Sequence, residues 1–126
     1  MGQAIELTAA DGFKLAAYRA DPAGNARGAL VVAQEIFGVN SHIKSVCDGF
    51  AADGYVAIAP ALFDRAEPNV QLGYGEQDIA RGRELKGRSG TDQALLDVRA
   101  AATSSKVASI CVRPLSSRPL ATSSGV

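Results

Sequence analysis

The sequence predicts a single α/β domain with a mostly parallel sheet, on three observations. Two short apolar runs, residues 29–33 and 55–60, have the length of buried strands. The segment between them repeats apolar residues at the three- and four-residue spacing of an amphipathic helix. A strand, a helix and a strand within about 30 residues form a right-handed βαβ unit, and the 126 residues suffice for one domain.

Two segments of partly alternating polarity, residues 4–7 and 13–18, precede this unit. They are separated by Asp11-Gly12, a dipeptide typical of hairpin turns. We therefore expect an antiparallel hairpin at an edge of the sheet. A loop rich in helix- and strand-breaking residues, 20–25, then leads to the buried strand at residue 29.

The first helix is expected to follow Gly38, with either Asn40 or Ser41 as its N-cap and an end near Asp53-Gly54. Its predicted apolar positions are Ile43, Val46, Cys47, Phe50 and Ala51.

Three further elements complete the predicted chain. Residues 61–72 read as an irregular loop, and residues 77–86 predict a polar helix that Gly82 and Gly87 weaken. Thr91 is expected to cap another helix, and residues 106–112 to begin a third buried strand beside residues 29–33. The apolar stripe predicted for the last helix is Ala94, Leu95, Val98, Ala101 and Ala102.

The composition argues against several classes of binding partner and against a metal site. Lys and Arg total 13, as do Asp and Glu, and no basic stripe appears, so nucleic acid and anionic membranes are not expected partners. The N-terminus lacks the pattern of a secretory signal and no apolar run spans a membrane, which predicts a cytoplasmic protein. Cys47 and Cys111 show no CxxC spacing and His42 is the one histidine, so no metal site is expected.

Glu35 is the first functional candidate because it follows the buried run 29–33. A carboxylate at the carboxyl end of a buried parallel strand is costly to desolvate without a partner, and ligands of open α/β sheets bind at that end. The alternative is that Glu35 simply faces water at the end of the strand.

Cys111 ends the last predicted strand, so its thiol and the Glu35 carboxylate would converge above one edge of the sheet. A thiol there can act as an acyl-transfer nucleophile, and the free amide of Ile36 could face the developing oxyanion. The alternative is that Cys111 is a small core residue, as we expect for Cys47. A capping or surface role is expected for His42.

The segment Gln34-Glu35-Ile36-Phe37-Gly38-Val39-Asn40, followed by His42-Ile43, Gly54-Tyr55, Ala59-Pro60 and Leu62-Phe63, resembles dienelactone hydrolases (carboxymethylenebutenolidases). These are members of the α/β-hydrolase fold. The resemblance runs from about residue 3 to residue 107 and is looser at residues 81–88. It implies an α/β-hydrolase-like, mostly parallel sheet with an N-terminal antiparallel hairpin, incomplete at its C-terminus, within a domain of residues 1–112.

The resemblance also implies an activity: hydrolysis of a small carboxylic ester or lactone by a cysteine nucleophile with an aspartate and a histidine, without metal or organic cofactor. By this resemblance Glu35 helps to activate the thiol, the amide of Ile36 contributes to the oxyanion hole, and Arg81 or Arg83 holds the carboxylate of the substrate.

The sequence departs from the family at the nucleophile. The family reads Gly-x-Cys-x-Gly-Gly, whereas Cys111 has Ser109 and Arg113 in glycine positions and Pro114 follows, which should spoil the sharp turn. Cys111 also lies closer to Lys106 than the family cysteine would. Residues 113–126 are predicted to be an irregular tail, and their composition suggests a gene read in a shifted frame. We therefore expect the N-terminal half of such a hydrolase, with little or no turnover.

Two alternatives come from other classes. One is a flavodoxin-like or receiver-like module that binds a ligand in the same crevice without catalysis, although the chain lacks a glycine-rich phosphate loop after its first parallel strand. The other is a fragment that is unstable alone and self-associates through an open sheet edge.

Overall fold

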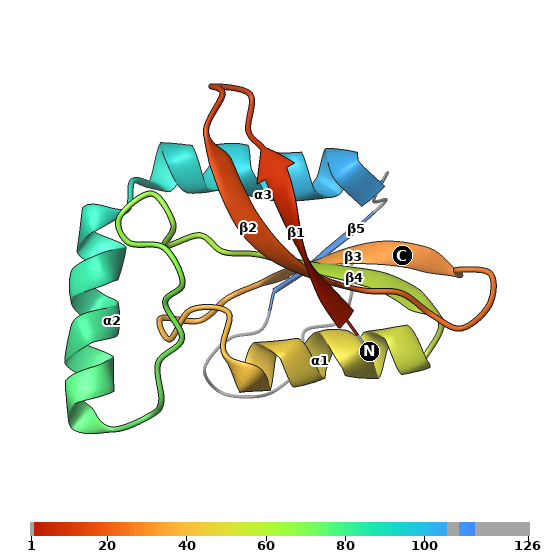
Figure 1. Cartoon of the computed structure of the whole chain (residues 1–126), viewed down its shortest axis with the longest axis horizontal. Helices are drawn as coiled ribbons and strands as arrows, with labels where there is room; N and C mark the ends of the chain where they lie inside the picture. The colour runs from red at the N-terminus through yellow and green to blue at the C-terminus, as the bar shows by residue number, and fades with distance from the viewer. Residues whose placement is uncertain (1, 106–108, 113–126) are drawn as a thin grey trace.

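The computed structural model of the chain describes residues 2–105 and 109–112. These residues form a five-stranded sheet in the order β1-β2-β4-β3-β5, with α1 against one face and α3 against the other (Figure 1). The elements in chain order are β1 (Gly2–Thr8), β2 (Lys14–Ala20), β3 (Gly28–Ala33), α1 (Ser41–Ala52), β4 (Tyr55–Pro60), α2 (Glu76–Arg88), α3 (Thr91–Ser105) and β5 (Ser109–Val112).

The predicted hairpin is confirmed. Strands β1 and β2 pair antiparallel from Gly2 opposite Ala20 to Thr8 opposite Lys14, and β2 continues into the sheet by pairing antiparallel with β4. The turn needs Gly12, whose φ of 90° is a conformation that side chains with a Cβ rarely adopt.

The predicted βαβ unit is also confirmed. Strands β3 and β4 pair in parallel, and α1 lies between them in sequence and packs on β4. Of the two cap candidates, Asn40 is the one used, since its side chain accepts a hydrogen bond of 3.1 Å from the backbone N–H of Ile43. Ile43 and Cys47 are completely buried in the core between α1 and the sheet.

Strand β5 pairs in parallel with β3, which is the neighbour expected for the strand predicted over residues 106–112; residues 106–108 and the burial of this strand lie outside the described part of the chain. The sheet of the described residues therefore ends on β1 and β5. Self-association through an open edge stays a prediction. Residues 113–126, including the tail with its shifted-frame hypothesis, lie outside the described residues.

The predicted apolar stripe of α3 is partly wrong. Ala101 is completely buried, but Leu95 is 55% exposed and the fully buried Asp97 takes a place on the packed face. The predicted cap is displaced by one residue, because Thr91 begins the helix and the N–H of Ala94 donates to the carbonyl of Gly90. Asp97 can face the packed side of the helix because its carboxylate forms an ion pair there with a cationic side chain.

That partner is Arg65, in the loop after β4. Its guanidinium donates to Asp97 at 2.9 and 3.1 Å and to Asp11 of the hairpin turn at 2.8 and 3.0 Å. It also lies 4.4 Å from the centre of the Phe13 ring, within range of a cation–π interaction. One side chain therefore joins the β1–β2 hairpin, the loop after β4 and α3.

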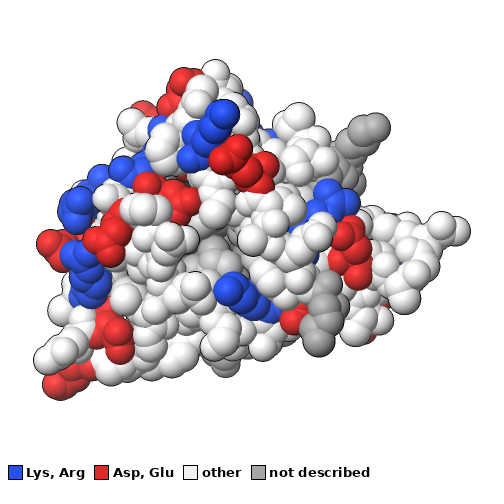
Figure 2. Space-filling view, in the orientation of Figure 1, with Lys and Arg blue, Asp and Glu red and all other residues white. Residues whose placement is uncertain are grey.

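Charged side chains of both signs alternate on the face shown in Figure 2, most densely over α2 and its neighbouring loop. In the part of the chain that the structure describes, no helix combines the length and hydrophobicity that crossing a membrane requires.

Replacement of Arg65 should destabilise the domain strongly. Arg65→Met leaves the buried Asp97 carboxylate without its cation, which typically costs about 3–5 kcal/mol of unfolding free energy. Arg19→Met is the matched control, because Arg19 and Asp21 form a half-exposed pair and such pairs contribute at most about 1 kcal/mol. Urea denaturation of the three proteins measures both changes, and similar losses in the two variants would contradict a special role for Arg65.

Acid should weaken the ion pair between Arg65 and Asp11 of the hairpin turn. Hydrogen bonds from Arg65 lower the pKa of Asp11 from 3.8 to about 2. A carboxyl group whose pKa is lower in the folded state contributes stability above its unfolded pKa, and this contribution is lost as the pH falls from 3.8 to about 2. Asp11→Asn should therefore show a flatter fall in unfolding free energy over that range than the wild type. Parallel curves from denaturation at each pH would show that the Asp11 pair contributes nothing.

Candidate active site

The candidate site is the tight turn that follows β3. The backbone N–H of Gly38 donates to the carbonyl of Glu35 at 3.2 Å, which closes the turn directly after the strand. Gly38 has a φ of 80°, and a Cβ there would overlap the carbonyl oxygen of Val70. Glycine at this position is thus required both by the backbone conformation and by the close approach of the neighbouring loop.

The loop before α2 holds the far side of the turn. The N–H of Leu72 donates to the carbonyl of Phe37 at 2.8 Å, and the amide of Asn40 donates to the carbonyl of Leu72 at 3.1 Å. The rings of Phe37 and Tyr74 meet edge to face, with centroids 4.5 Å apart. Asn40 therefore caps α1 and ties the turn to this loop at the same time.

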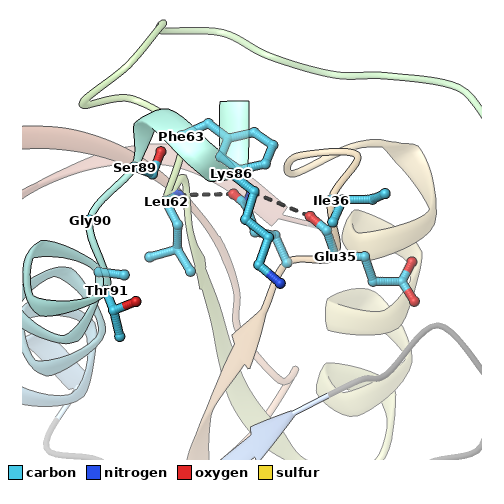
Figure 3. Close-up of a pocket in the computed structure, with 10 residues that line it drawn as sticks. Glu35, Ile36, Leu62, Phe63, Lys86, Ser89, Gly90 and Thr91 are labelled. Carbon is cyan, nitrogen blue, oxygen red and sulfur yellow. Dashed lines mark hydrogen bonds between the residues drawn. The ribbon is translucent and has the colours of Figure 1, made fainter. Parts of the chain in front are cut away.

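Gln34 holds the near side of the turn. Its side-chain oxygen accepts from the N–H of Leu62, just after β4, at 2.8 Å, and its side-chain nitrogen donates to the carbonyl of Glu35 at 3.3 Å. Both hydrogen bonds are drawn in Figure 3. The ends of the two central parallel strands are thereby joined by one side chain.

Helix α2 packs directly on the turn through Gly82. This glycine is buried, and a Cβ on it would collide with the carbonyl oxygen of Ile36. The glycine that weakened the helix prediction is therefore the residue that lets α2 approach the site.

The Glu35 side chain is half-buried, and its carboxylate forms no hydrogen bond or ion pair with the residues that the structure describes. In Figure 3 the carboxylate extends away from Leu62 at the end of β4. Because β4 and β5 border opposite edges of β3, the carboxylate lies toward the β5 side of that strand in this view.

Glu35 and Ile36 separate two hollows. The first, of about 380 Å³, receives the ammonium group of Lys86, as Figure 3 shows. It is lined by Gln34, Glu35, Ile36, Leu62, Phe63, Lys86, Ser89, Gly90, Thr91 and Ala94. The second, of about 500 Å³, is lined by Glu35, Ile36, Phe37, His42, Tyr74, Ile79 and Arg83.

The two arginine candidates have different surroundings. Arg81 donates to Glu84 at 2.7 Å and also pairs with Glu67, and these two carboxylates raise its pKa. Arg83 is exposed, lines the hollow beside Glu35 and has no ion pair with a described residue. Arg83 lines one of the two hollows that Glu35 also lines, and Arg81 lines neither of these two hollows.

Cys111 lies within β5, opposite Val32 and one residue before the strand ends at Val112. Its side chain lies outside the described part of the chain, so the predicted convergence with Glu35 stays a prediction. His42 occupies the first turn of α1 and borders the second hollow. Cys47 is completely buried in the core, as expected.

Gln34 and Lys86 are site residues that sequence reasoning did not single out. Gln34 had a detectable signal, since it is a polar residue directly after a buried apolar run, beside Glu35. Lys86 had none, because one lysine in a polar helix resembles any solvated surface residue. Among the described residues, no group of three or more histidine, cysteine or carboxylate side chains could hold a metal ion.

The mixed sheet, its N-terminal hairpin and the polar turn at the carboxyl end of β3 define the α/β-hydrolase class. Within this class, the sequence profile of the dienelactone hydrolase family matches residues 15–114. The chain therefore belongs to the dienelactone hydrolase family.

Individual relatives agree with this assignment. A protein of Synechocystis sp. named "Putative carboxymethylenebutenolidase" is 42% identical over 89 residues, which are 70% of this chain and 36% of the relative. A protein of the same name from Azospirillum brasilense is 49% identical over 69 residues, covering 54% of this chain and 30% of the relative.

A crystal structure titled "Putative Dienelactone Hydrolase", from Klebsiella pneumoniae, superposes with a TM-score of 0.66 at 29% identity. The match covers 84% of this chain and 44% of that protein. The chain thus spans roughly a third of the curated relatives that it matches and less than half of this structural neighbour.

The packing of α2 on the turn can be tested with two glycines of one helix. Gly82→Ala should destabilise the domain by about 1–3 kcal/mol, because the new methyl group collides with the Ile36 carbonyl. Gly87→Ala should stabilise it by up to about 1 kcal/mol, because no atom lies within 4 Å of the added Cβ and alanine favours the helix. Unfolding free energies measure both. Equal effects would show that α2 is not held at this distance from the turn.

Proposed function

We propose that this chain carries the glutamate and oxyanion-binding parts of a hydrolase that cleaves small carboxylic esters or lactones through a cysteine nucleophile. One observation carries the proposal: Glu35 and Ile36 share a rigidly held turn at the carboxyl end of β3, next to β5. Ligands of such sheets bind at the carboxyl ends of the strands. Membership of the dienelactone hydrolase family supports this reaction class.

In the proposed reaction the Cys111 thiol gives its proton to Glu35, and the sulfur attacks the carbonyl carbon of the ester. The negative charge that develops on the carbonyl oxygen is stabilised by the N–H of Ile36. Collapse of the tetrahedral intermediate expels the alcohol oxygen, which takes up the proton from Glu35 and leaves a thioester on Cys111. Water then hydrolyses the thioester, which releases the acid and restores the thiol.

Arg83 is the residue that we propose to hold a carboxylate of the substrate. It borders the hollow beside Glu35 and has no described ion pair, whereas Arg81 is already neutralised by Glu67 and Glu84. The guanidinium of Arg83 can therefore bind an incoming carboxylate without first breaking an existing ion pair.

Turnover by this chain is expected to be slow. The family reaction uses a histidine and an aspartate with the cysteine. The one histidine of this sequence, His42, lies in the first turn of α1, where we expect a capping or surface role. Without a histidine that reaches the thiol, only the carboxylate, the oxyanion site and substrate binding remain, and these give modest catalysis.

Acylation by p-nitrophenyl acetate tests the proposal. We expect a burst of at most about one equivalent of p-nitrophenolate, followed by turnover close to the uncatalysed rate, with the acetyl group found on the peptide that contains Cys111. Cys111→Ala should abolish the burst, and Glu35→Gln should slow it about tenfold or more because the base is lost.

Glu6→Gln is the control, since Glu6 is an exposed carboxylate on β1, far from the turn. Acylation of another residue, or none at all in correctly folded protein, would contradict the thiol nucleophile. Rapid multiple turnover that depends on Cys111 would instead contradict the expected slow reaction.

A further inference from the structure

We infer that Gln34 is a positioning residue that aims the N–H of Ile36 toward the β5 side of the sheet. This inference rests on the proposed function, because it explains how the oxyanion donor is oriented. The side chain of Gln34 uses both ends of its amide, one on the N–H of Leu62 and the other on the carbonyl of Glu35. The second contact acts on the peptide unit that contains the Ile36 N–H.

Peptide geometry converts this contact into an orientation. The carbonyl and the N–H of one trans peptide point in opposite directions, and no cis peptide occurs among the described residues. The Glu35 carbonyl accepts from the N–H of Gly38 at 3.2 Å and from the Gln34 amide at 3.3 Å, and that amide lies beside Leu62, just after β4 (Figure 3). The Ile36 N–H of the same peptide therefore points away from these two donors, and the side of β3 away from β4 is the side that β5 borders.

The N–H of Ile36, oriented in this way, is available to bind an oxyanion. Within residues 2–105 and 109–112, the N–H of Ile36 has no hydrogen-bond acceptor, whereas the adjoining Glu35 carbonyl receives two hydrogen bonds, from Gly38 and from Gln34. A peptide held by its carbonyl and open at its N–H is the arrangement that an oxyanion site requires, because the donor does not need to reorient when charge develops.

A simpler role for Gln34 would be purely structural. We call this role a strap: the side chain would only tie the end of β3 to the end of β4 through Leu62. The two roles use different atoms of the same amide: the strap needs the oxygen that accepts from Leu62, and the positioning role needs the nitrogen that donates to Glu35. Gln34→Glu separates them, since it keeps an oxygen for Leu62 and replaces the donor with an acceptor that repels the Glu35 carbonyl. Gln34→Met removes both contacts.

The orientation of the Ile36 N–H bond is measured by residual dipolar couplings in the ¹⁵N-labelled chain, and its order by the heteronuclear NOE. We expect Gln34→Glu to change the Ile36 coupling and lower its order while the coupling of Leu62 stays as in the wild type. Gln71→Met is the matched control, because the hydrogen bond described for this nearby side-chain amide joins its oxygen to the ammonium group of Lys44 and does not involve the turn. It should leave the Ile36 values unchanged.

An unchanged Ile36 coupling in a folded Gln34→Glu variant would overturn the inference and leave Gln34 as a strap. This readout does not depend on chemistry, so it decides the role of Gln34 even if the chain is never acylated, a result that would count against the proposed function alone. Where acylation occurs, Gln34→Glu should lower the maximal rate of acylation by about tenfold or more at an unchanged half-saturating ester concentration. A change confined to the half-saturating concentration would also contradict the positioning role.

Discussion

The buried carboxylate of Asp97 needs a cation, and Arg65 supplies it from the loop after β4. An unpaired buried charge would cost several kcal/mol, so this pairing determines where α3 and the loop lie relative to each other. Arg65 follows Leu62 by three residues. The loop that the ion pair holds on the α3 face of the sheet is therefore the same loop whose Leu62 N–H donates to Gln34 of the turn after β3.

The turn itself is held from three directions by contacts between segments far apart in sequence. Gln34 joins it to the loop after β4, Asn40 and Phe37 join it to the loop before α2, and Gly82 lets α2 contact the Ile36 carbonyl. Such restraint suits an oxyanion site, where donors that are already oriented stabilise developing charge better than donors that must reorganise. Stability and proposed chemistry thus depend on the same contacts, since the groups that close the turn also leave the Ile36 N–H without a described acceptor.

Membership of the dienelactone hydrolase family and the geometry of the turn support each other, because the segment that carries the resemblance is held in place by contacts from three other segments. The structure also distinguishes between Arg81 and Arg83, which the sequence offered as equal candidates for binding the substrate carboxylate. Arg81 and Arg83 are two positions apart on one helix, yet one is neutralised by glutamates and the other faces the hollow beside Glu35. A helix turns successive residues by about 100°, so neighbouring arginines meet different surroundings.

The sequence by itself determined the hairpin, the βαβ unit and the use of Asn40 or Ser41 as a cap, because these depend on local periodicity, on Asp11-Gly12 and on polar residues at helix starts. It also placed Glu35 and Ile36 at a strand end. Only the tertiary structure decided that Asp97 is buried while Leu95 is exposed, and that Gln34 bridges two strand ends. Those outcomes depend on Arg65 and Leu62, which lie about 30 residues away in sequence, and no local pattern records a partner at that separation.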